Sequence, residues 1–174
     1  MGPQPTCLAL ADGEHCPLAC YDCMCAAPDT PIATPSGERR IADLSQGDLV
    51  YSVSGEAIVA VPVVRVNRTP VVNHSVIRVA LANGRVLEMS AGHPLADGRT
   101  FADLESTALF DGERVLEATR VPYGHPFTYD ILPASTSGTY FAAGVLVGST
   151  LTKARATDAP AADRSATGGD PTLR

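Results

Sequence analysis

The chain has 174 residues, of which 45% are hydrophobic and 18% are charged. This length and composition support one hydrophobic core and not two, so we expect a single domain. The net charge is −6 and the Lys and Arg residues are scattered, which leaves no basic surface for nucleic acid or anionic lipid. We therefore expect a monomer with neither a nucleic-acid nor a membrane partner.

The chain as written lacks the pattern of a signal peptide and any apolar run of about 18 residues. Its compartment is therefore unknown, and we expect secretion only if the true start lies upstream.

Residues 1–24 are a Cys-rich upstream segment that is too short to hold a core, and we expect a loop or the stump of a larger upstream region. The five cysteines of the chain are Cys7, Cys16, Cys20, Cys23 and Cys25. An odd number leaves one thiol over if the others form disulfides, and such a thiol is a candidate reactive group. Alternatively, tetrahedral zinc accepts Cys and His at short spacings, which makes Cys16, Cys20 and Cys23 candidate metal ligands.

The sequence from residue 31 onward predicts short strands, because its apolar or alternating runs are too short for helices. The runs are Pro31 to Thr34, Leu49 to Val53, Ala57 to Arg68, Ser75 to Ala82, Arg85 to Met89, Arg114 to Val121, Phe127 to Leu132 and Tyr140 to Val147. Residues 39–44 and 102–109 are the two candidates for a helical turn. The pattern predicts an all-β domain, a class that also includes ordinary sandwiches and barrels.

Turn signals separate these runs, and none of the runs repeats at a fixed period. The pair Asn83-Gly84 is the strongest hairpin signal, and it predicts a type I′ turn with positive φ at both residues. Residues 152–174 contain almost no large apolar side chain, so we expect a disordered polar tail.

The segment from Cys25 to Ser52 carries a specific pattern: a Cys, an Asp-Thr pair, a short strand, a Gly turn, an apolar pair and a Gly-Asp pair. Its residues are Cys25, Asp29, Thr30, Ile32, Gly37, Ile41, Leu44, Gly47, Asp48 and Val50. It resembles the opening block of Hint (hedgehog/intein) domains, of the bacterial intein-like self-processing type.

Two further blocks extend this resemblance over residues 25–151, which we expect to form the Hint domain. GRVLEMSAGHPL, residues 84–95, resembles the Thr-x-x-His block of the family, with Ser90 in place of Thr and with His93 matched. Residues 128–150 resemble its two C-terminal strands, with Asp130 at an acidic position. The implied fold is a compact, pseudo-two-fold horseshoe of short antiparallel strands and hairpins.

The resemblance implies that Cys25 breaks its own bond to Met24 by an N-to-S acyl shift. The bond is resistant because its C–N link has partial double-bond character, and a Cys with an ordinary pKa near 8.5 is mostly a protonated thiol. On the analogy, His93 would protonate the departing nitrogen, and Ser90 would donate a hydrogen bond to the same amide and distort or polarise it. Asp130 would take up or relay the thiol proton. The chain would act on itself in a single turnover, and no cofactor is implied.

The chain departs from splicing inteins at its C-terminal end. Gly148 and Ser149 stand where splicing inteins carry His-Asn, and Ser149 has no amide side chain to form a succinimide. We therefore expect hydrolysis of the thioester, or transfer of the upstream segment to a small nucleophile, without full splicing.

Other interpretations remain open on the sequence alone. The chain could be an inactive Hint fold that serves as a binding or spacer module, a Cys-rich zinc module, or a secreted domain stapled by disulfides. His93 lies between Gly92 and Pro94 and could be an ordinary turn residue. His125 matches no position of the family and is expected to be structural or exposed.

Overall fold

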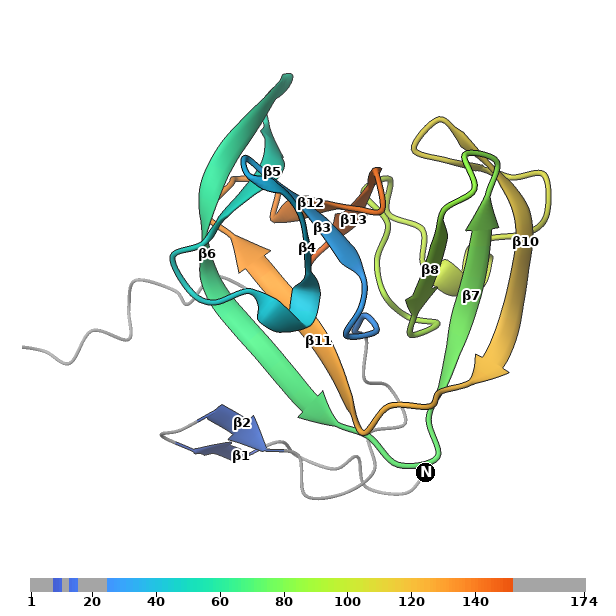
Figure 1. Ribbon diagram of the computed structural model, residues 1–174, viewed down its shortest axis with the longest axis horizontal. Helices are drawn as coiled ribbons and strands as arrows, with labels where there is room; N and C mark the ends of the chain where they lie inside the picture. The colour runs from blue at the N-terminus through green and yellow to red at the C-terminus, as the bar shows by residue number, and fades with distance from the viewer. Residues whose placement is uncertain (1–7, 11–12, 16–24, 152–174) are drawn as a thin grey trace, which may run out of the picture.

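The computed structural model describes residues 8–10, 13–15 and 25–151, and nearly all of its regular elements are strands (Figure 1). In chain order these elements are β1 (Leu8–Leu10), β2 (Gly13–His15), β3 (Pro31–Thr34), β4 (Gly37–Arg40), the 3-10 turn η1 (Ile41–Asp43), β5 (Leu49–Ser54), β6 (Ala57–Pro70), β7 (Ser75–Leu81), β8 (Val86–Met89), the 3-10 turn η2 (Phe101–Asp103), β9 (Leu109–Phe110), β10 (Glu113–Pro122), β11 (Phe127–Pro133), β12 (Thr139–Ala142) and β13 (Val145–Gly148). Within these residues no helix is long and apolar enough to cross a membrane.

Residues 25–151 build three antiparallel sheets that together form a horseshoe (Figure 1). The first arm consists of β11, β6 and β5, and the second arm consists of β8, β7, β10 and β9. A third sheet, in the order β13-β12-β3-β4, lies between the arms in Figure 1. The predicted all-β horseshoe is confirmed.

Each arm contains a copy of one short backbone motif. The sequence Ile-Ala-Asp-Leu at Ile41–Leu44 precedes β5, and Phe-Ala-Asp-Leu at Phe101–Leu104 precedes β9. In both copies the fourth residue donates its N–H to the carbonyl of the first, at 3.2 Å and 3.3 Å. The sequence shows no fixed period because this motif occurs only twice, but the two copies give the horseshoe its pseudo-two-fold symmetry.

The correspondence continues into the turn that follows each copy. Gly47 donates its N–H to the Val63 carbonyl at 2.8 Å, and Thr107, at the same place in the second copy, donates to the Val115 carbonyl at 2.8 Å. Both residues have positive φ, of 95° for Gly47 and 77° for Thr107. A β-branched residue is strained in this left-handed region, whereas glycine is not. The second arm therefore carries backbone strain that the first arm avoids.

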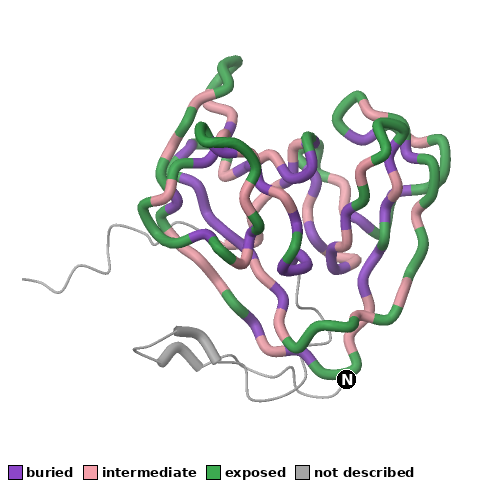
Figure 2. The backbone as a smooth tube through the Cα atoms, viewed as in Figure 1, coloured by how far each residue is buried: buried purple, intermediate pink, exposed green. Residues whose placement is uncertain are grey.

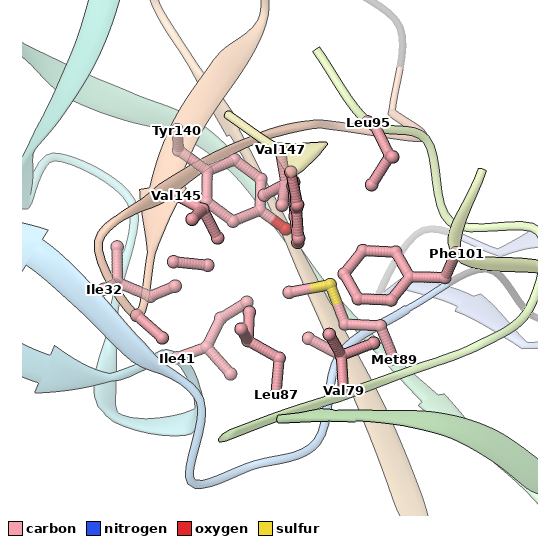
Figure 3. Packing of buried hydrophobic residues seen from close by; sticks show 14 of the residues in the cluster. Ile32, Ile41, Val79, Leu87, Met89, Leu95, Phe101, Tyr140, Val145 and Val147 are labelled. Carbon is pink, nitrogen blue, oxygen red and sulfur yellow. The ribbon is translucent and has the colours of Figure 1, made fainter. Parts of the chain in front are cut away.

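The hydrophobic core fills the space between the arms and the third sheet. In Figure 2 the buried stretches lie mostly along the strands in the middle of the molecule, and Figure 3 shows side chains from β3, β7, β8, β12 and β13 converging there. Met89, Phe101 and Tyr140 are fully buried, and the Phe101 ring packs edge-on against Phe110 at 5.5 Å. The inward alternation of these strands therefore encloses the candidate site in apolar side chains.

The hairpin predicted at Asn83-Gly84 is present between β7 and β8, but the predicted turn type is wrong. Gly84 has a φ of 84°, whereas Asn83 is not among the residues with positive φ. The Gly84 N–H donates to the Leu81 carbonyl at 3.0 Å, so the turn starts one residue earlier and Gly84 follows its two central residues. This geometry is a type I turn with a glycine bulge, the usual form of a three-residue loop.

Other elements differ from the sequence prediction for similar local reasons. The run from Tyr140 to Val147 divides into β12 and β13, because Ala143 and Gly144 form a turn with φ of 50° and 82°. The strand β4 was not predicted, since its GERR sequence lies at the edge of its sheet and is mostly exposed.

Three shorter segments also test the sequence prediction. The helical turns expected at 39–44 and 102–109 are the short 3-10 turns η1 and η2, and β9 occupies the end of the second range. In the upstream segment, β1 pairs with β2, so the expectation of a loop there is wrong for residues 8–10 and 13–15. The predicted tail lies outside the described residues.

The repeated turn generates a prediction about stability. We expect Thr107→Gly to raise the free energy of unfolding by about 1 kcal/mol, because it removes the strain of a β-branched residue in the left-handed region. Gly47→Thr should lower it by a similar amount, and no atom lies within 4 Å of a Cβ added there, so packing does not confuse the comparison. Urea denaturation of both variants checks the prediction. Changes of the same sign in the free energy of unfolding of the two variants would contradict it.

Candidate active site

The segment that begins at Cys25 connects the two arms of the horseshoe. On one side, Ala26 exchanges backbone hydrogen bonds with Tyr129 of β11, at 2.7 Å and 2.9 Å. On the other side, Ser90, which follows β8, donates its N–H to the Cys25 carbonyl at 2.9 Å. The Cys25 side chain is a thiol that is only 4% exposed. The backbone on both sides therefore holds this thiol in a fixed, buried position.

The Ser90 hydroxyl lies against the amide nitrogen of Cys25, which belongs to the Met24 to Cys25 peptide bond. The Cys25 N–H donates to the Ser90 Oγ at 3.2 Å, so the expectation that Ser90 donates to this amide is wrong in direction. The hydroxyl also lies 3.1 Å from the Cys25 carbonyl oxygen. A third neighbour is His74, whose Nε2 lies 2.9 Å from the same oxygen. Ser90 is buried, so this oxygen makes its hydrogen bonds within the protein.

His93 is fully buried and its backbone is fixed at both ends. Its N–H donates to the Ser90 carbonyl at 3.0 Å, and its carbonyl accepts from the N–H of Phe101 at 3.1 Å. The ring packs edge-on against Phe101 and Tyr140, and its Nε2 lies 3.4 Å from the Tyr140 hydroxyl. Ser90 and His93 thus lie on one tight turn, with both side chains in the buried interior.

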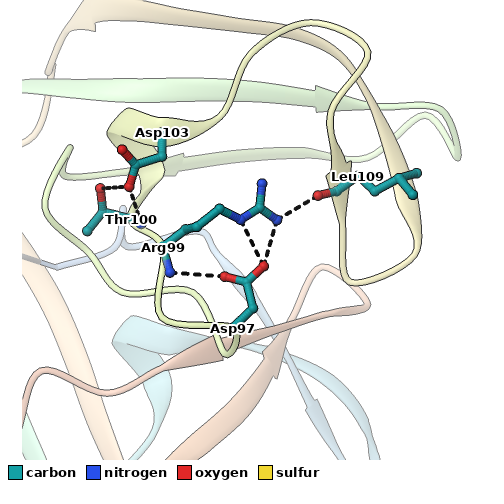
Figure 4. Close-up of polar contacts among 5 residues, drawn as sticks. All are labelled: Asp97, Arg99, Thr100, Asp103 and Leu109. Atoms are coloured by element: carbon teal, nitrogen blue, oxygen red, sulfur yellow. Dashed lines mark hydrogen bonds and ion pairs between the residues drawn. The ribbon is translucent and has the colours of Figure 1, made fainter.

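The loop after His93 is held by two polar turns, which Figure 4 shows. The Asp97 carboxylate accepts from the backbone N–H of Arg99 at 3.0 Å and from its guanidinium at 2.9 Å and 2.6 Å. The Asp103 carboxylate accepts from the N–H and the hydroxyl of Thr100 at 2.7 Å and 2.8 Å. The hydrogen bonds from Arg99 hold the pKa of Asp97 below its usual range. These turns fix the start of η2, whose first N–H binds the His93 carbonyl.

Asp130 is fully buried on β11 and accepts several hydrogen bonds. Its Oδ1 accepts from the Tyr140 hydroxyl at 2.9 Å, and its Oδ2 accepts from the N–H and hydroxyl of Thr150 at 2.7 Å and 2.6 Å. Ser149 adds a contact of 3.3 Å from its hydroxyl. Burial, and then the adjacent Asp130, raise the pKa of Tyr140 well above its usual value, so this hydroxyl stays a neutral donor.

The structure therefore brings the four sequence-predicted site residues into two groups, each linked by its own hydrogen bonds. Cys25 and Ser90 are in direct contact, while Tyr140 links His93 to Asp130. The candidate zinc ligands Cys16, Cys20 and Cys23 lie outside the described residues. Among the residues that the structure does describe, no cluster of His, Cys, Asp and Glu could hold a metal ion.

Sequence reasoning missed His74, Tyr140 and Thr150. The hairpin signal could have found His74, because pairing of Ile77 with Met89 carries the residues just before β7 toward Ser90. Tyr140 reads as an ordinary strand residue, and nothing in the sequence distinguishes it.

Comparison with known proteins identifies the fold. No protein-family model matches the chain, and no curated protein matches its sequence. Solved structures do match. The Ssp DnaB mini-intein variant M86 is 15% identical, with a TM-score of 0.63 over 76% of this chain and 97% of that chain. A bacterial intein-like domain from Clostridium thermocellum is 20% identical, with a TM-score of 0.60 over 72% and 96%.

A third structure, the MchDnaB-1 intein, is 23% identical, with a TM-score of 0.57 over 71% of this chain and 98% of that chain. The chain spans almost the whole length of these domains. Its fold is therefore the Hint fold, as the sequence predicted.

The link between Tyr140 and Asp130 generates a prediction about stability. We expect Tyr140→Phe to lower the free energy of unfolding by about 2 kcal/mol, because a buried carboxylate loses a hydrogen-bond donor. Tyr123→Phe is the matched control, since its hydroxyl donates at 2.7 Å to an uncharged carbonyl and is only half-buried. Urea denaturation should show the larger loss for Tyr140→Phe, and losses of equal size would contradict the prediction.

Proposed function

We propose that this chain is a self-processing domain in which Cys25 breaks its own peptide bond to Met24. The observation that carries the proposal is the contact of 3.2 Å between the Ser90 hydroxyl and the amide nitrogen of Cys25. The contact joins the two parts of the sequence that resemble the Hint family, and it lies on the nitrogen that must leave. The Hint fold supplies the second support, since the structures that share it are inteins and intein-like domains.

The reaction is an N-to-S acyl shift. The Cys25 sulfur attacks the carbonyl carbon of Met24 and loses its proton, and the bond from that carbon to the Cys25 nitrogen breaks. The nitrogen takes up a proton and becomes a free amine, so no atom is gained or lost. Holding the thiol beside its target makes the step intramolecular, and this proximity lowers the barrier.

His93 is the proposed general acid that protonates the departing nitrogen. Its ring is buried and held by Phe101 and Tyr140, so its direction is fixed before the reaction. Ser90 polarises the amide by accepting its N–H. Asp130 is the proposed acceptor or relay of the thiol proton, and its connection to His93 through the Tyr140 hydroxyl supports a shared proton network.

The C-terminal end supports cleavage or transfer and not splicing. Ser149 stands where a splicing intein carries Asn and has no amide with which to cyclise. Gly148 stands where such an intein carries His, and a Cβ added there would lie 3.2 Å from the Pro94 Cγ. The ring of Pro94 thus occupies the space that a side chain at this position would need. Water or a small nucleophile would then resolve the thioester in a single turnover.

The proposal predicts release of the upstream segment by nucleophiles that attack thioesters. We expect the full chain treated with dithiothreitol or hydroxylamine to lose residues 1–24, as seen by intact mass spectrometry. Cys25→Ala should keep its full mass, because the substitution removes the thiol that forms the thioester in this proposal. A wild-type mass that stays unchanged after long incubation would refute the proposal and would favour the inactive binding or spacer module.

The assigned roles predict the size of two further effects. We expect Ser90→Ala and His93→Ala each to slow the release by about 100-fold, the lower part of the usual range for general acid catalysis. Thr119→Ala is a control, because Thr119 is exposed on β10 and its hydroxyl donates to the exposed side chain of Glu117. Release rates followed by mass spectrometry, with thermal melts to verify folding, check the prediction. A folded His93→Ala variant with the wild-type rate would remove His93 from the mechanism.

A further inference from the structure

His74 contacts the candidate site, but the proposed mechanism does not use it. It ends the turn between β6 and β7, and its Nε2 lies 2.9 Å from the Ser90 Oγ. The Ser90 hydroxyl has one proton and accepts the Cys25 N–H, so that proton points either to His74 or to the Cys25 carbonyl. The protonation state of His74 decides between these two arrangements.

The surroundings fix the His74 ring and leave it a path to water. The Tyr123 N–H donates to the His74 carbonyl at 3.0 Å, and the two rings meet edge-on with centroids 5.6 Å apart. On its other side the half-buried ring lines a surface pocket of about 560 Å³, together with Arg120 of β10. The ring can therefore exchange protons with solvent while it keeps its contact with Ser90.

The groups that face His74 favour its neutral form near neutral pH. Burial, and then the charge of Arg120, lower the pKa of His74 below its usual value of 6.5. Arg120 lies on β10 and Tyr123 on the turn that follows it, and His125 packs behind Tyr123 with ring centroids 5.3 Å apart. The imidazolium is therefore scarce at neutral pH and becomes common only as the pH falls, and it is a stronger acid than an ordinary histidine.

We propose that His74 is a positioning residue for the acyl shift, which orients the Ser90 hydroxyl and resupplies its proton. This inference rests on the proposed function. As an imidazolium, His74 donates to the Ser90 Oγ and turns the hydroxyl proton away from its own ring. When the Cys25 sulfur adds to the Met24 carbonyl, the nitrogen becomes pyramidal and gains a lone pair, and the Ser90 hydroxyl turns from the Cys25 carbonyl and passes its proton to this nitrogen.

The number of protons is conserved in this relay. The nitrogen gains one proton from the Ser90 hydroxyl, and the oxygen takes one from the His74 Nε2. The imidazolium becomes neutral imidazole and recovers its proton from water through the pocket. The relay provides a second path for protons to the nitrogen, separate from His93, and it is strongest at low pH. At high pH the path through His74 closes and His93 carries the step alone.

The test compares release of residues 1–24 from the full chain across pH 5.5 to 8.5, with hydroxylamine as the probe. We expect His74→Gln to be about tenfold slower than wild type at pH 5.5 and nearly equal to it at pH 8.5. Glutamine can still hydrogen-bond Ser90 but cannot give up a proton. The ratio of the two rates at each pH cancels the ionisation of the probe.

Two controls separate the relay from a structural effect. His125→Gln should match wild type at every pH, because this exposed histidine packs against Tyr123 and is not a partner of Ser90. In a Ser90→Ala background, His74→Gln should change the rate by less than twofold, since His74 acts only through that hydroxyl. A ratio that does not vary with pH, or a tenfold effect without Ser90, would overturn the inference. Wild type that releases nothing would refute the proposed function instead.

A second measurement does not depend on cleavage. In the Cys25→Ala chain, nitrogen NMR of the imidazole rings should show His74 titrating below pH 6.5. Adding Ser90→Ala should lower this pKa further, because the imidazolium loses its acceptor. A His74 titration that is indifferent to Ser90 would show that the contact does not exist in solution, and the inference would fail even if the chain cleaves.

Discussion

The backbone pairing of Ala26 is the constraint on which the rest of the site depends. Ala26 bridges to Tyr129 of the first arm and to Met89 of the second, so the two arms meet at the residue after Cys25. Backbone hydrogen bonds are short and directional, and those on both sides of Cys25 leave its thiol little freedom. The position of the Cys25 thiol is thus set by the sheets themselves and not by a surface loop.

Around this constraint the fold buries polar groups that would be costly in an apolar core without partners. The carboxylate of Asp130 is fully buried, and donors from Tyr140, Ser149 and Thr150 compensate its desolvation. A buried polar network of this kind is rigid because each member has few alternative partners. The same apolar walls that make these hydrogen bonds strong also exclude water from the Cys25 amide.

The sequence predicts the fold and part of the site for different reasons. The spacing from Ser90 to His93 is local, so a motif of four residues is enough to place both side chains on one turn. The partners that were missed come from elsewhere in the chain, and only tertiary packing brings them together. His74 follows a turn between two long strands, and Tyr140 is one aromatic residue in an apolar strand, so neither has a local pattern of its own.

Whether a strand could be predicted from the sequence depends on whether one of its faces is buried. Runs with one buried face, such as β5 and β7, follow the alternation that burial imposes. The strand β4 has no such face, and the turn at Ala143 and Gly144 depends on φ values that the sequence only weakly encodes. The repeated turn of the two arms was also invisible, because the packing residue is Ile41 in one copy and Phe101 in the other.

The attachment of both ends of the domain to one strand has a mechanical consequence. The chain enters beside Tyr129, through Ala26, and it leaves beside Asp130, through Thr150, so neighbouring residues of β11 anchor both ends. A force that pulls the two flanks apart therefore passes through the hydrogen bonds at two adjacent residues of β11, a strand of the first arm. Tension in the flanking chain would be felt first at the Cys25 amide and at β11, while strands farther from β11 carry less of the load.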